Sequence, residues 1–214
     1  AINRQIFEMQ IPFIHVEPDN KILLNMLEKM GLYLAEKPIW KLTKLTKKFK
    51  KAVVLDDITI SFEPGKIYGL RGKNGSGKTM LMRAICGLIL PTSGEIRING
   101  EVLHKDIAFP RSVGALIENP SFLPDLSGYK NLIMLNKLSK IASEEEIVKV
   151  LEDVALDPKD KKPYKKYSLG MKQKLGVANA ILGAPDIIIL DEPINALDED
   201  TVVKIKKLLI DLRD

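Results

Sequence analysis

The chain has 214 residues, and its 33 lysines and arginines against 28 aspartates and glutamates leave a formal net charge of +5. With 45% hydrophobic residues and a mean hydropathy of -0.01, the composition excludes a disordered, collagen-like or membrane-spanning chain. The length predicts one sizeable domain with an accessory piece. The single Cys86 excludes an internal disulfide, and no Cys/His cluster has metal-ligand spacing, so we expect a reducing, cytoplasmic compartment.

Neither of two apolar segments fits a membrane or export signal. The longest, residues 177–190, is interrupted by Pro185 and Asp186 and is shorter than the roughly 18 residues that a transmembrane helix needs. At the N-terminus, Glu8 and Pro12 break any apolar core, and no small-residue cleavage site follows. We therefore expect the chain to reach a membrane only through a partner chain.

Residues 1–36 form an N-terminal extension of unknown role. Apolar and polar residues alternate over residues 7–13, which predicts a half-exposed edge strand. A cap at Asp19 or Asn20 predicts a short helix that ends at Gly31. The extension carries no recognisable chemistry, so it either covers an edge of the fold or docks a partner.

The next part of the chain is rich in strands and turns. Alternating residues predict antiparallel strands over residues 39–49 and 53–62. The segment 94–100 ends in Asn99-Gly100, a dipeptide typical of tight hairpins. This part of the chain is therefore expected to form antiparallel β-structure.

An α/β pattern is interleaved with these strands. A short strand, Ile67–Leu70, leads into a glycine-rich loop and then into an apolar helix over Met80–Ile85, which Gly87 can close. A second buried strand is predicted much later in the chain, over Ile187–Leu190, and a last helix over Val202–Leu212.

The segment between the two buried strands is predicted to be helical. Ser143 and Glu146 form a capping box for a helix that runs to about Leu156, and another helix runs over residues 169–182. The predicted fold class is therefore α/β, with an antiparallel β-part and an all-helical arm.

The glycine-rich loop fits the pattern G-x-x-x-x-G-K-[ST], and it lies between a predicted strand and a predicted helix, as this phosphate-binding motif requires. Its glycines let backbone N–H groups turn toward a phosphate, and the following helix adds its positive end. Lys78 is expected to reach the β- and γ-phosphates and to act in catalysis, and Thr79 to ligate Mg²⁺. The predicted nucleotide-binding residues are Gly72, Asn74, Gly75, Ser76, Gly77, Lys78, Thr79 and Met80.

Two carboxylates follow the second buried strand. Asp191 and Glu192 come directly after Ile187–Leu190, at the end of a strand where open α/β sheets place their ligands. We expect Asp191 to hold Mg²⁺ through water and Glu192 to activate the attacking water as a catalytic base.

Over about residues 39–214 the chain resembles the nucleotide-binding subunits of ATP-binding-cassette (ABC) transporters. The segment 167–173, Y-S-L-G-M-K-Q, is similar to the family signature L-S-G-G-Q and is expected to open the second helix of the arm. Ser168 and Gly170 keep the serine and the second glycine, whereas Leu169 and Met171 replace the first glycine and the glutamine. By this resemblance, Ser168 caps the helix and, with Gly170, faces a γ-phosphate held by another subunit.

Three further positions carry the resemblance. The segment 195–198, N-A-L-D, resembles the D-loop that communicates between two ATPase subunits. Phe49 matches the aromatic residue that stacks on adenine, although from the sequence alone it is equally a core residue. Glu118 stands where most of the family has a glutamine that touches Mg²⁺, so we expect Glu118 to be a metal ligand, with a solvent-facing loop residue as the alternative.

The glutamate at position 118, together with Y-S-L-G-M-K-Q, resembles the subgroup that exports bacitracin and lantibiotic-type peptides. This resemblance implies a P-loop NTPase core with an antiparallel β-subdomain and a helical arm at about residues 120–183, within an ABC ATPase domain over residues 37–214. The family's switch histidine is not found before Asp214, so the C-terminal part is expected to be missing.

The same resemblance implies ATP and Mg²⁺ as cofactors and transport-coupled ATP hydrolysis as the activity. The expected partners are a second ATPase subunit, in a homodimer or heterodimer, and integral membrane permease subunits on the inner face of the cell membrane. The groove beside residues 118–126 is the expected docking surface for the permease, with Phe122 and Leu123 as apolar anchors.

Two alternatives remain from the sequence. Lysine-rich runs at residues 37–51 and 159–166 can mark a nucleic-acid-binding surface. Such a surface would suit the first alternative, a soluble ABC ATPase acting in translation or DNA repair. No aromatic residues interleave with either run, so no nucleic acid is expected. A P-loop kinase or GTPase would share only the phosphate loop, and residues 136–139 lack the aspartate of the guanine-reading motif.

Overall fold

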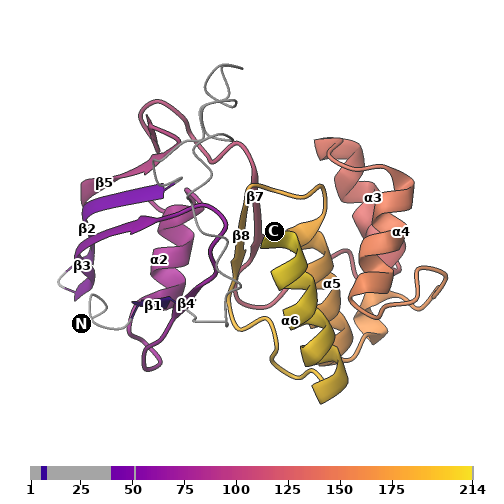
Figure 1. Cartoon of the computed structure of the whole chain (residues 1–214). Coiled ribbons are helices and arrows are strands. Elements are labelled where there is room, and N and C mark those ends of the chain that lie inside the picture. The colour runs from indigo at the N-terminus through magenta and orange to yellow at the C-terminus, as the bar shows by residue number, and fades with distance from the viewer. Residues whose placement is uncertain (1–5, 9–39, 51, 214) are drawn as a thin grey trace, which may run out of the picture. The chain divides into compact units, whose positions relative to one another are not determined.

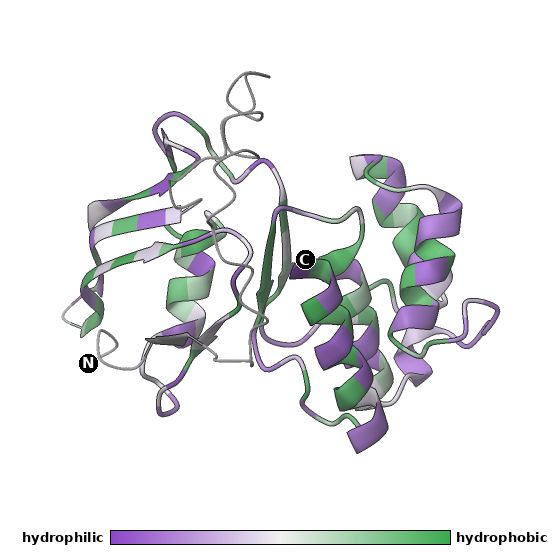
Figure 2. Cartoon of the chain, in the orientation of Figure 1, coloured by the Kyte–Doolittle hydropathy of each residue, from purple (hydrophilic) through white to green (hydrophobic). Residues whose placement is uncertain are grey.

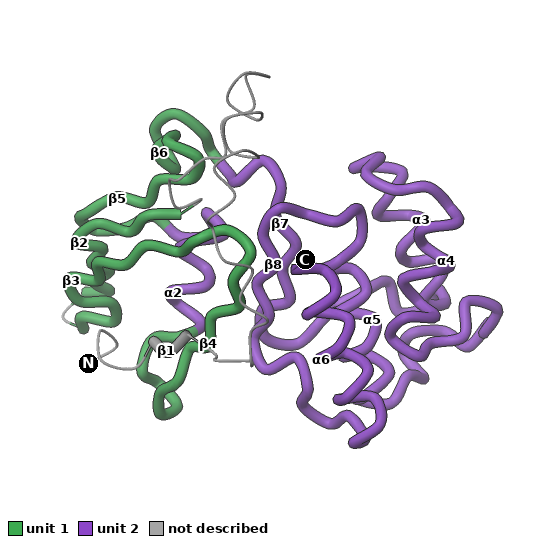
Figure 3. The backbone as a smooth tube through the Cα atoms, viewed as in Figure 1, with its two compact units in different colours: residues 1–78, 90–108 green, residues 79–89, 109–214 purple. Residues whose placement is uncertain are grey.

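The computed structural model describes residues 6–8, 40–50 and 52–213. The chain divides into two compact units, shown in different colours in Figure 3. Unit 1 comprises residues 1–78 and 90–108, and unit 2 comprises residues 79–89 and 109–214. The helix predicted to end at Gly31 lies outside the described residues.

Unit 1 is built on a four-stranded antiparallel sheet with the strand order β3-β2-β5-β6 (Figure 1). Its strands are β2 (Trp40–Phe49), β3 (Ala52–Phe62), β5 (Ser93–Ile98) and β6 (Glu101–Val102). Asn99 and Gly100 form the turn between β5 and β6, both with positive φ, as their dipeptide predicts.

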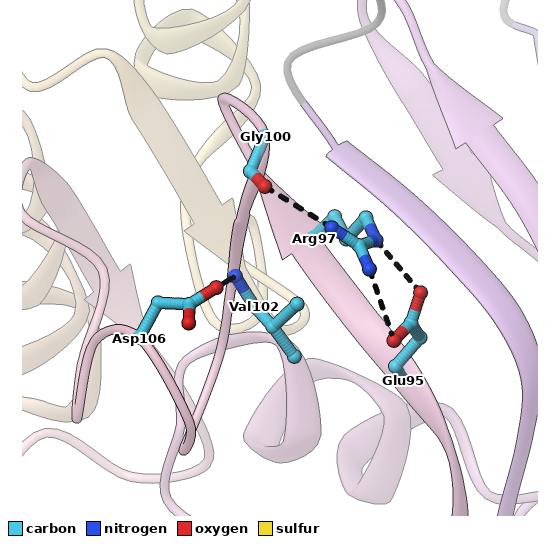
Figure 4. A network of polar contacts seen from close by, with 5 residues as sticks. All are labelled: Glu95, Arg97, Gly100, Val102 and Asp106. Atoms are coloured by element: carbon cyan, nitrogen blue, oxygen red, sulfur yellow. Dashed lines mark hydrogen bonds and ion pairs between the residues drawn. The ribbon is translucent and has the colours of Figure 1, made fainter.

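One face of this sheet forms the core of unit 1. Buried apolar side chains alternate along the strands: Trp40, Leu42, Leu45, Leu55, Ile58, Ile96 and Ile98. The opposite face carries polar pairs, among them Arg97, whose guanidinium binds the Glu95 carboxylate and the Gly100 carbonyl (Figure 4). Nearby, the Asp106 carboxylate accepts from the backbone N–H of Val102 and so holds the loop after β6.

A second, two-stranded sheet in unit 1 leads into the phosphate loop. Strand β4 (Tyr68–Leu70) pairs antiparallel with β1 (Ile6–Glu8). The sequence predicts a strand over residues 7–13, of which only residues 7 and 8 are described. The N-terminal extension therefore contributes at least one strand to unit 1.

Unit 2 combines a parallel strand pair with helices. Strands β7 (Val113–Leu116) and β8 (Ile187–Leu190) pair in parallel, with Leu116 opposite Leu190. The helices are α2 (Lys78–Ile85, in unit 2 from Thr79 on), α3 (Gly128–Ser139), α4 (Glu144–Asp153), α5 (Leu169–Ile181) and α6 (Glu199–Arg213), with a 3₁₀ turn η2 (Tyr164–Lys166) before α5. Figure 1 shows α3 and α4 lying side by side.

The core of unit 2 lies among β7, α3, α4, α5 and α6. Its fully buried side chains include Leu132, Ile147, Leu151, Leu175 and Ile205. Figure 2 shows the apolar residues alternating with polar ones along these helices. Helix α5 packs directly on β7 at Gly114. The backbones are so close there that a Cβ atom at Gly114 would lie 1.6 Å from the Ala180 carbonyl oxygen. Only glycine permits this approach.

The helical arm has one helix more than predicted. Helix α3 was not predicted, so the signature segment opens the third α-helix of the arm and not the second. The Ser143–Glu146 capping box is confirmed in both of its hydrogen bonds. Helix α4 ends at Asp153, before the predicted Leu156, and α6 begins at Glu199, before the predicted Val202. Among the described residues, no helix is long and apolar enough to cross a membrane.

Candidate functional site

In unit 1, the phosphate loop follows β4 and closes around its own lysine. The Lys78 ammonium donates hydrogen bonds to the carbonyl oxygens of Gly72 (2.8 Å) and Lys73 (3.2 Å). Gly75 and Gly77 have φ angles of +77° and +97°, which lets the chain curl as it enters α2. The loop therefore holds the Lys78 ammonium against its own carbonyl oxygens, and the phosphate-binding role of Lys78 stays a prediction.

The loop also contains a buried polar atom that suits an anionic ligand. The Ser76 hydroxyl oxygen is buried and has no hydrogen-bond partner among the described residues. An unpaired hydroxyl, in a loop that also holds an ammonium and leads into a helix N-terminus, fits a bound phosphate. Asn74 is exposed in the turn, and Met80 is half-buried in the first turn of α2.

In unit 2, one hydrogen bond joins two of the three predicted metal ligands, Thr79 and Asp191. Thr79, in the first turn of α2, donates from Oγ1 to Oδ2 of Asp191 at 2.8 Å, across 112 residues of sequence. The backbone N–H of Asp191 donates to the Leu116 carbonyl at 2.7 Å, which fixes the end of β8 against β7. A hydroxyl and a carboxylate oxygen are ligands that Mg²⁺ prefers, so this pair fits the metal.

Glu192 is positioned from two sides. The buried Gln173 side chain of α5 donates to the Glu192 carbonyl oxygen at 2.9 Å. The Asn195 amide donates to Oε2 of the Glu192 carboxylate. Glu192 itself has a positive φ of 49°, so its backbone departs from the strand direction directly after Asp191. The side chain is exposed, as a base that must reach a water molecule requires.

Glu118 is paired with a cation of the same unit. The Glu118 carboxylate accepts from the Arg83 guanidinium of α2 at 2.8 Å, and the two side chains are 53% and 35% exposed. Within the described part of the chain, no three His, Cys, Asp or Glu side chains are placed to hold one metal ion, so Glu118 does not assemble with Asp191 and Glu192. A metal-facing role of Glu118 stays a prediction.

The signature segment forms one wall of a hollow in unit 2. Ser168 caps α5, accepting a hydrogen bond from the backbone N–H of Met171 at 3.2 Å, as predicted. The N-terminus of α5 and residues 196–198 line a hollow of about 410 Å³ that is open to solvent. A Cβ atom at Gly170 would lie 2.7 Å from the Ala196 carbonyl oxygen, so this position needs glycine.

Asp198, the last residue of the segment 195–198, caps the N-terminus of α6. Its carboxylate accepts from the backbone N–H and the hydroxyl of Thr201, both at 2.8 Å. These hydrogen bonds, the backbone one first, lower the pKa of Asp198 below its ordinary value. The Lys174 ammonium of α5 lies 3.8 Å from the same carboxylate.

Phe49 is the last residue of β2, within the strand predicted over residues 39–49, and it is 45% exposed. The exposure argues against the alternative of a core residue. The Lys47 ammonium lies 4.7 Å from the ring centroid and also donates to the Leu90 carbonyl, which holds it in place. The adenine-stacking role of Phe49 stays a prediction.

Of the two apolar anchors predicted for the docking surface beside residues 118–126, only Leu123 is well exposed. The Phe122 ring is partly buried and packs edge-to-face on Tyr164, at 5.4 Å between ring centroids, so it belongs to the core. Leu123 is 50% exposed and remains available. The loop is fixed by the buried Asn131, which bonds Leu123, Leu126 and Ser127 of the backbone.

Two side chains that position the site were not identified from the sequence. Gln173 and Arg83 act on Glu192 and Glu118 through contacts between different elements of unit 2. A signal for Gln173 exists, because it is a polar residue among buried positions of α5 that are otherwise apolar. Arg83 has no comparable signal, since a partly exposed arginine in the last turn of a helix is ordinary.

Solved structures support the fold. The structure of an ATP-binding subunit of an ABC transporter matches with a TM-score of 0.71 and 24% identity, covering 82% of this chain and 75% of that chain. A dimeric ATP-binding cassette in a post-hydrolysis state with ADP and Pi also gives 0.71, at 22% identity, covering 82% and 83%. At these identities the likeness concerns the fold alone.

Similar curated proteins are transport ATP-binding proteins. YybJ of Bacillus subtilis (strain 168), an ABC transporter ATP-binding protein, is 53% identical over 166 residues, covering 78% of this chain and 76% of YybJ. The bacitracin transport protein BcrA of Enterococcus faecalis is 42% identical, covering 77% of this chain but only 54% of BcrA. The lantibiotic transport protein SrtF of Streptococcus pyogenes is 36% identical, covering 79% and 72%.

The ABC transporter family model matches residues 55–195, which run from β3 through the Asp191–Glu192 pair. The match includes the phosphate loop and the signature segment, whose contacts are described above. The chain therefore belongs to the ABC transporter family, with the fold of an ABC ATPase domain.

Proposed function

We propose that this chain is the ATP-binding and ATP-hydrolysing subunit of a transporter that exports a bacitracin- or lantibiotic-type peptide, or another substrate, through separate membrane subunits. The observation that carries the proposal is the 2.8 Å hydrogen bond from Thr79 to Asp191. This bond brings together the end of the phosphate motif and the acidic end of β8, which are far apart in sequence. ATP hydrolysis needs both, because one binds the phosphates and the other supplies the carboxylates for the metal ion and the attacking water.

Each residue has a role in the proposed reaction. Lys78 binds the β- and γ-phosphates, and Thr79 and Asp191 hold Mg²⁺, which supplies positive charge to the phosphate oxygens when bound. Glu192 accepts a proton from the attacking water, and Gln173 and Asn195 keep it in place.

The proposal gives roles to two further sets of residues, Phe49 and the signature residues Ser168 and Gly170. Phe49 is the residue proposed to stack on the adenine. Ser168 and Gly170 face the phosphate of a second ATPase subunit, because the capped end of α5 presents its positive pole and lines an open hollow. The physiological unit is accordingly a dimer, either of two copies or of this chain and a similar one.

The proposed membrane partners follow from the relatives. BcrA and SrtF are named as transport proteins for bacitracin and a lantibiotic. We propose that this chain acts on the cytoplasmic face of the cell membrane, bound to permease subunits through the loop before α3. The exposed Leu123, in a loop that Asn131 holds rigid, suits a preformed docking surface.

A susceptibility assay tests the exported substrate. The gene and its membrane partner, identified by co-purification from membranes, are expressed together in a peptide-sensitive bacterium. The proposal expects higher resistance to bacitracin or to a lantibiotic, and loss of that resistance in the Glu192→Gln variant. Equal susceptibility with and without the pair would contradict the proposed substrate class. It would not contradict the proposed ATPase activity, which is tested separately by measuring ATP hydrolysis.

A further inference from the structure

Two side-chain pairs connect one face of α2 to the carboxyl ends of the parallel strands. Thr79 donates to Asp191 at 2.8 Å, and Arg83 donates to Glu118 at the same distance. Thr79 and Arg83 are four residues apart on α2, so their side chains lie on one helix face, one turn apart. The Arg83–Glu118 pair is thus the neighbour of the proposed metal-binding pair.

The backbone explains why Glu118 comes so close to the same helix face. Strands β7 and β8 are paired with Leu116 opposite Leu190, and Asp191 donates its N–H to the Leu116 carbonyl. Asp191 and Glu118 therefore leave the sheet at the same end. A positive φ of 59° at Glu118 turns the chain there. Two carboxylates leaving one edge repel each other unless cations neutralise them.

We propose that Arg83 is a positioning residue that competes with the divalent metal ion for the Glu118 carboxylate and so sets the metal requirement of the site. The inference rests on the proposed function. A carboxylate oxygen in a close charge-assisted hydrogen bond with a guanidinium is less available to a metal ion. Arg83 keeps Glu118 paired in the metal-free chain, and its removal leaves Glu118 free to ligate the metal.

The test is a titration of Mg²⁺ against binding of a fluorescent, non-hydrolysable ATP analogue, on the wild-type chain and three variants. Arg83→Gln should lower the Mg²⁺ midpoint by about two- to fivefold, the range that exposed ion pairs support. Glu118→Gln should raise it, because a ligand is lost. The double variant should match Glu118→Gln alone, since Arg83 acts only through that carboxylate.

A matched control exists in unit 1. Arg97 pairs with Glu95 at 2.7 Å, and the two side chains are 44% and 39% exposed, similar to the Arg83–Glu118 pair (Figure 4). Arg97→Gln removes a comparable ion pair and a comparable charge, and it should leave the Mg²⁺ midpoint unchanged. Arg83→Lys keeps the charge but not the two-nitrogen geometry, so its midpoint should lie between those of wild type and Arg83→Gln.

Three results decide the matter. A wild-type midpoint in Arg83→Gln would overturn the inference and leave Arg83 a surface ion pair. An equal shift from Arg83→Gln in the wild-type chain and in the Glu118→Gln variant would also overturn it, because the effect would then not pass through the Glu118 carboxylate. If the wild-type chain shows no Mg²⁺-dependent nucleotide binding, the proposed function fails, and the inference fails with it. If Arg83→Gln does not fold, Arg83→Lys takes its place in the comparison.

Discussion

The Lys78 ammonium donates hydrogen bonds to two carbonyl oxygens of its own loop, and under the proposed function it binds the phosphates of ATP. We predict that Lys78→Ala weakens binding of MgATP by at least about 100-fold, because charge-assisted hydrogen bonds to the phosphates are lost. The fold should persist, and isothermal calorimetry with a melting curve measures both properties. Lys73→Ala, which removes an exposed lysine side chain from the same loop, is the control and should bind MgATP like the wild type.

Calorimetry would contradict the assignment of Lys78 if the Lys78→Ala variant bound MgATP as tightly as the wild type. It would also do so if Lys73→Ala lost as much affinity as Lys78→Ala, because the effect would then be one of net charge.

Asp198 gives a prediction about pH. Hydrogen bonds from Thr201 lower its pKa in the folded chain, so the ionised carboxylate adds stability above the unfolded pKa of about 3.9. This contribution is lost as the pH falls through the lower, folded-state pKa. Asp198→Asn should therefore destabilise the chain at pH 7, by urea denaturation, and the difference from wild type should shrink in acid. A difference of equal size at pH 7 and pH 3 would show that the charge of Asp198 is not responsible.

At the scale of residues, the sequence identifies groups with intrinsic chemistry but not their supporting contacts. Thr79 and Asp191 were predicted to share a metal ion, and they are hydrogen-bonded. Gln173 and Arg83 were not identified, because their partners are set by how α5 and α2 pack within unit 2. The contact between the Lys47 ammonium and the Phe49 ring was not predicted either, because it depends on the geometry of β2 and belongs to no sequence motif.

Single capping interactions determine where helices begin, and Ser143 is the clearest case. Its hydroxyl accepts from the Glu146 N–H, and the Glu146 carboxylate accepts from the Ser143 N–H. Ser143→Ala should lower the free energy of unfolding by about 1 kcal/mol, measured by urea denaturation. Ser139, in the last turn of α3, donates back to the Leu135 carbonyl of its own helix and caps no helix start, so Ser139→Ala is the control and should change stability little. Equal losses in both variants would contradict a capping role.

The elements with strong local signals were predicted well. Strand β8 begins and ends where its apolar run does, and Ser168 caps α5. Helix α3 was missed because its local signals are mixed. It begins at Gly128, a poor helix former, and its second half exposes Met134, Leu135 and Leu138, so no clean apolar stripe marks one face. Its position depends on the buried Asn131, whose role is set by the preceding loop.

At the scale of the whole molecule, the proposed dimer predicts a trapped state. Glu192→Gln removes the base but keeps a side chain of the same shape, so nucleotide should stay bound without hydrolysis. The variant should then accumulate as a nucleotide-bound dimer on size-exclusion chromatography with saturating MgATP. The control is Lys78→Ala under the same conditions, which should remain monomeric. A monomer in both variants would count against closure of the dimer around nucleotide.

The central claim is that this chain hydrolyses ATP in a Mg²⁺-dependent reaction with Glu192 as its base. The most direct measurement is phosphate release by the purified chain, with Mg²⁺ or EDTA, for wild type and Glu192→Gln. We predict release only with Mg²⁺ and a decrease of at least about 100-fold in the variant, the effect expected for loss of a general base. Release at the wild-type rate by Glu192→Gln, or release that persists in EDTA, would contradict the account.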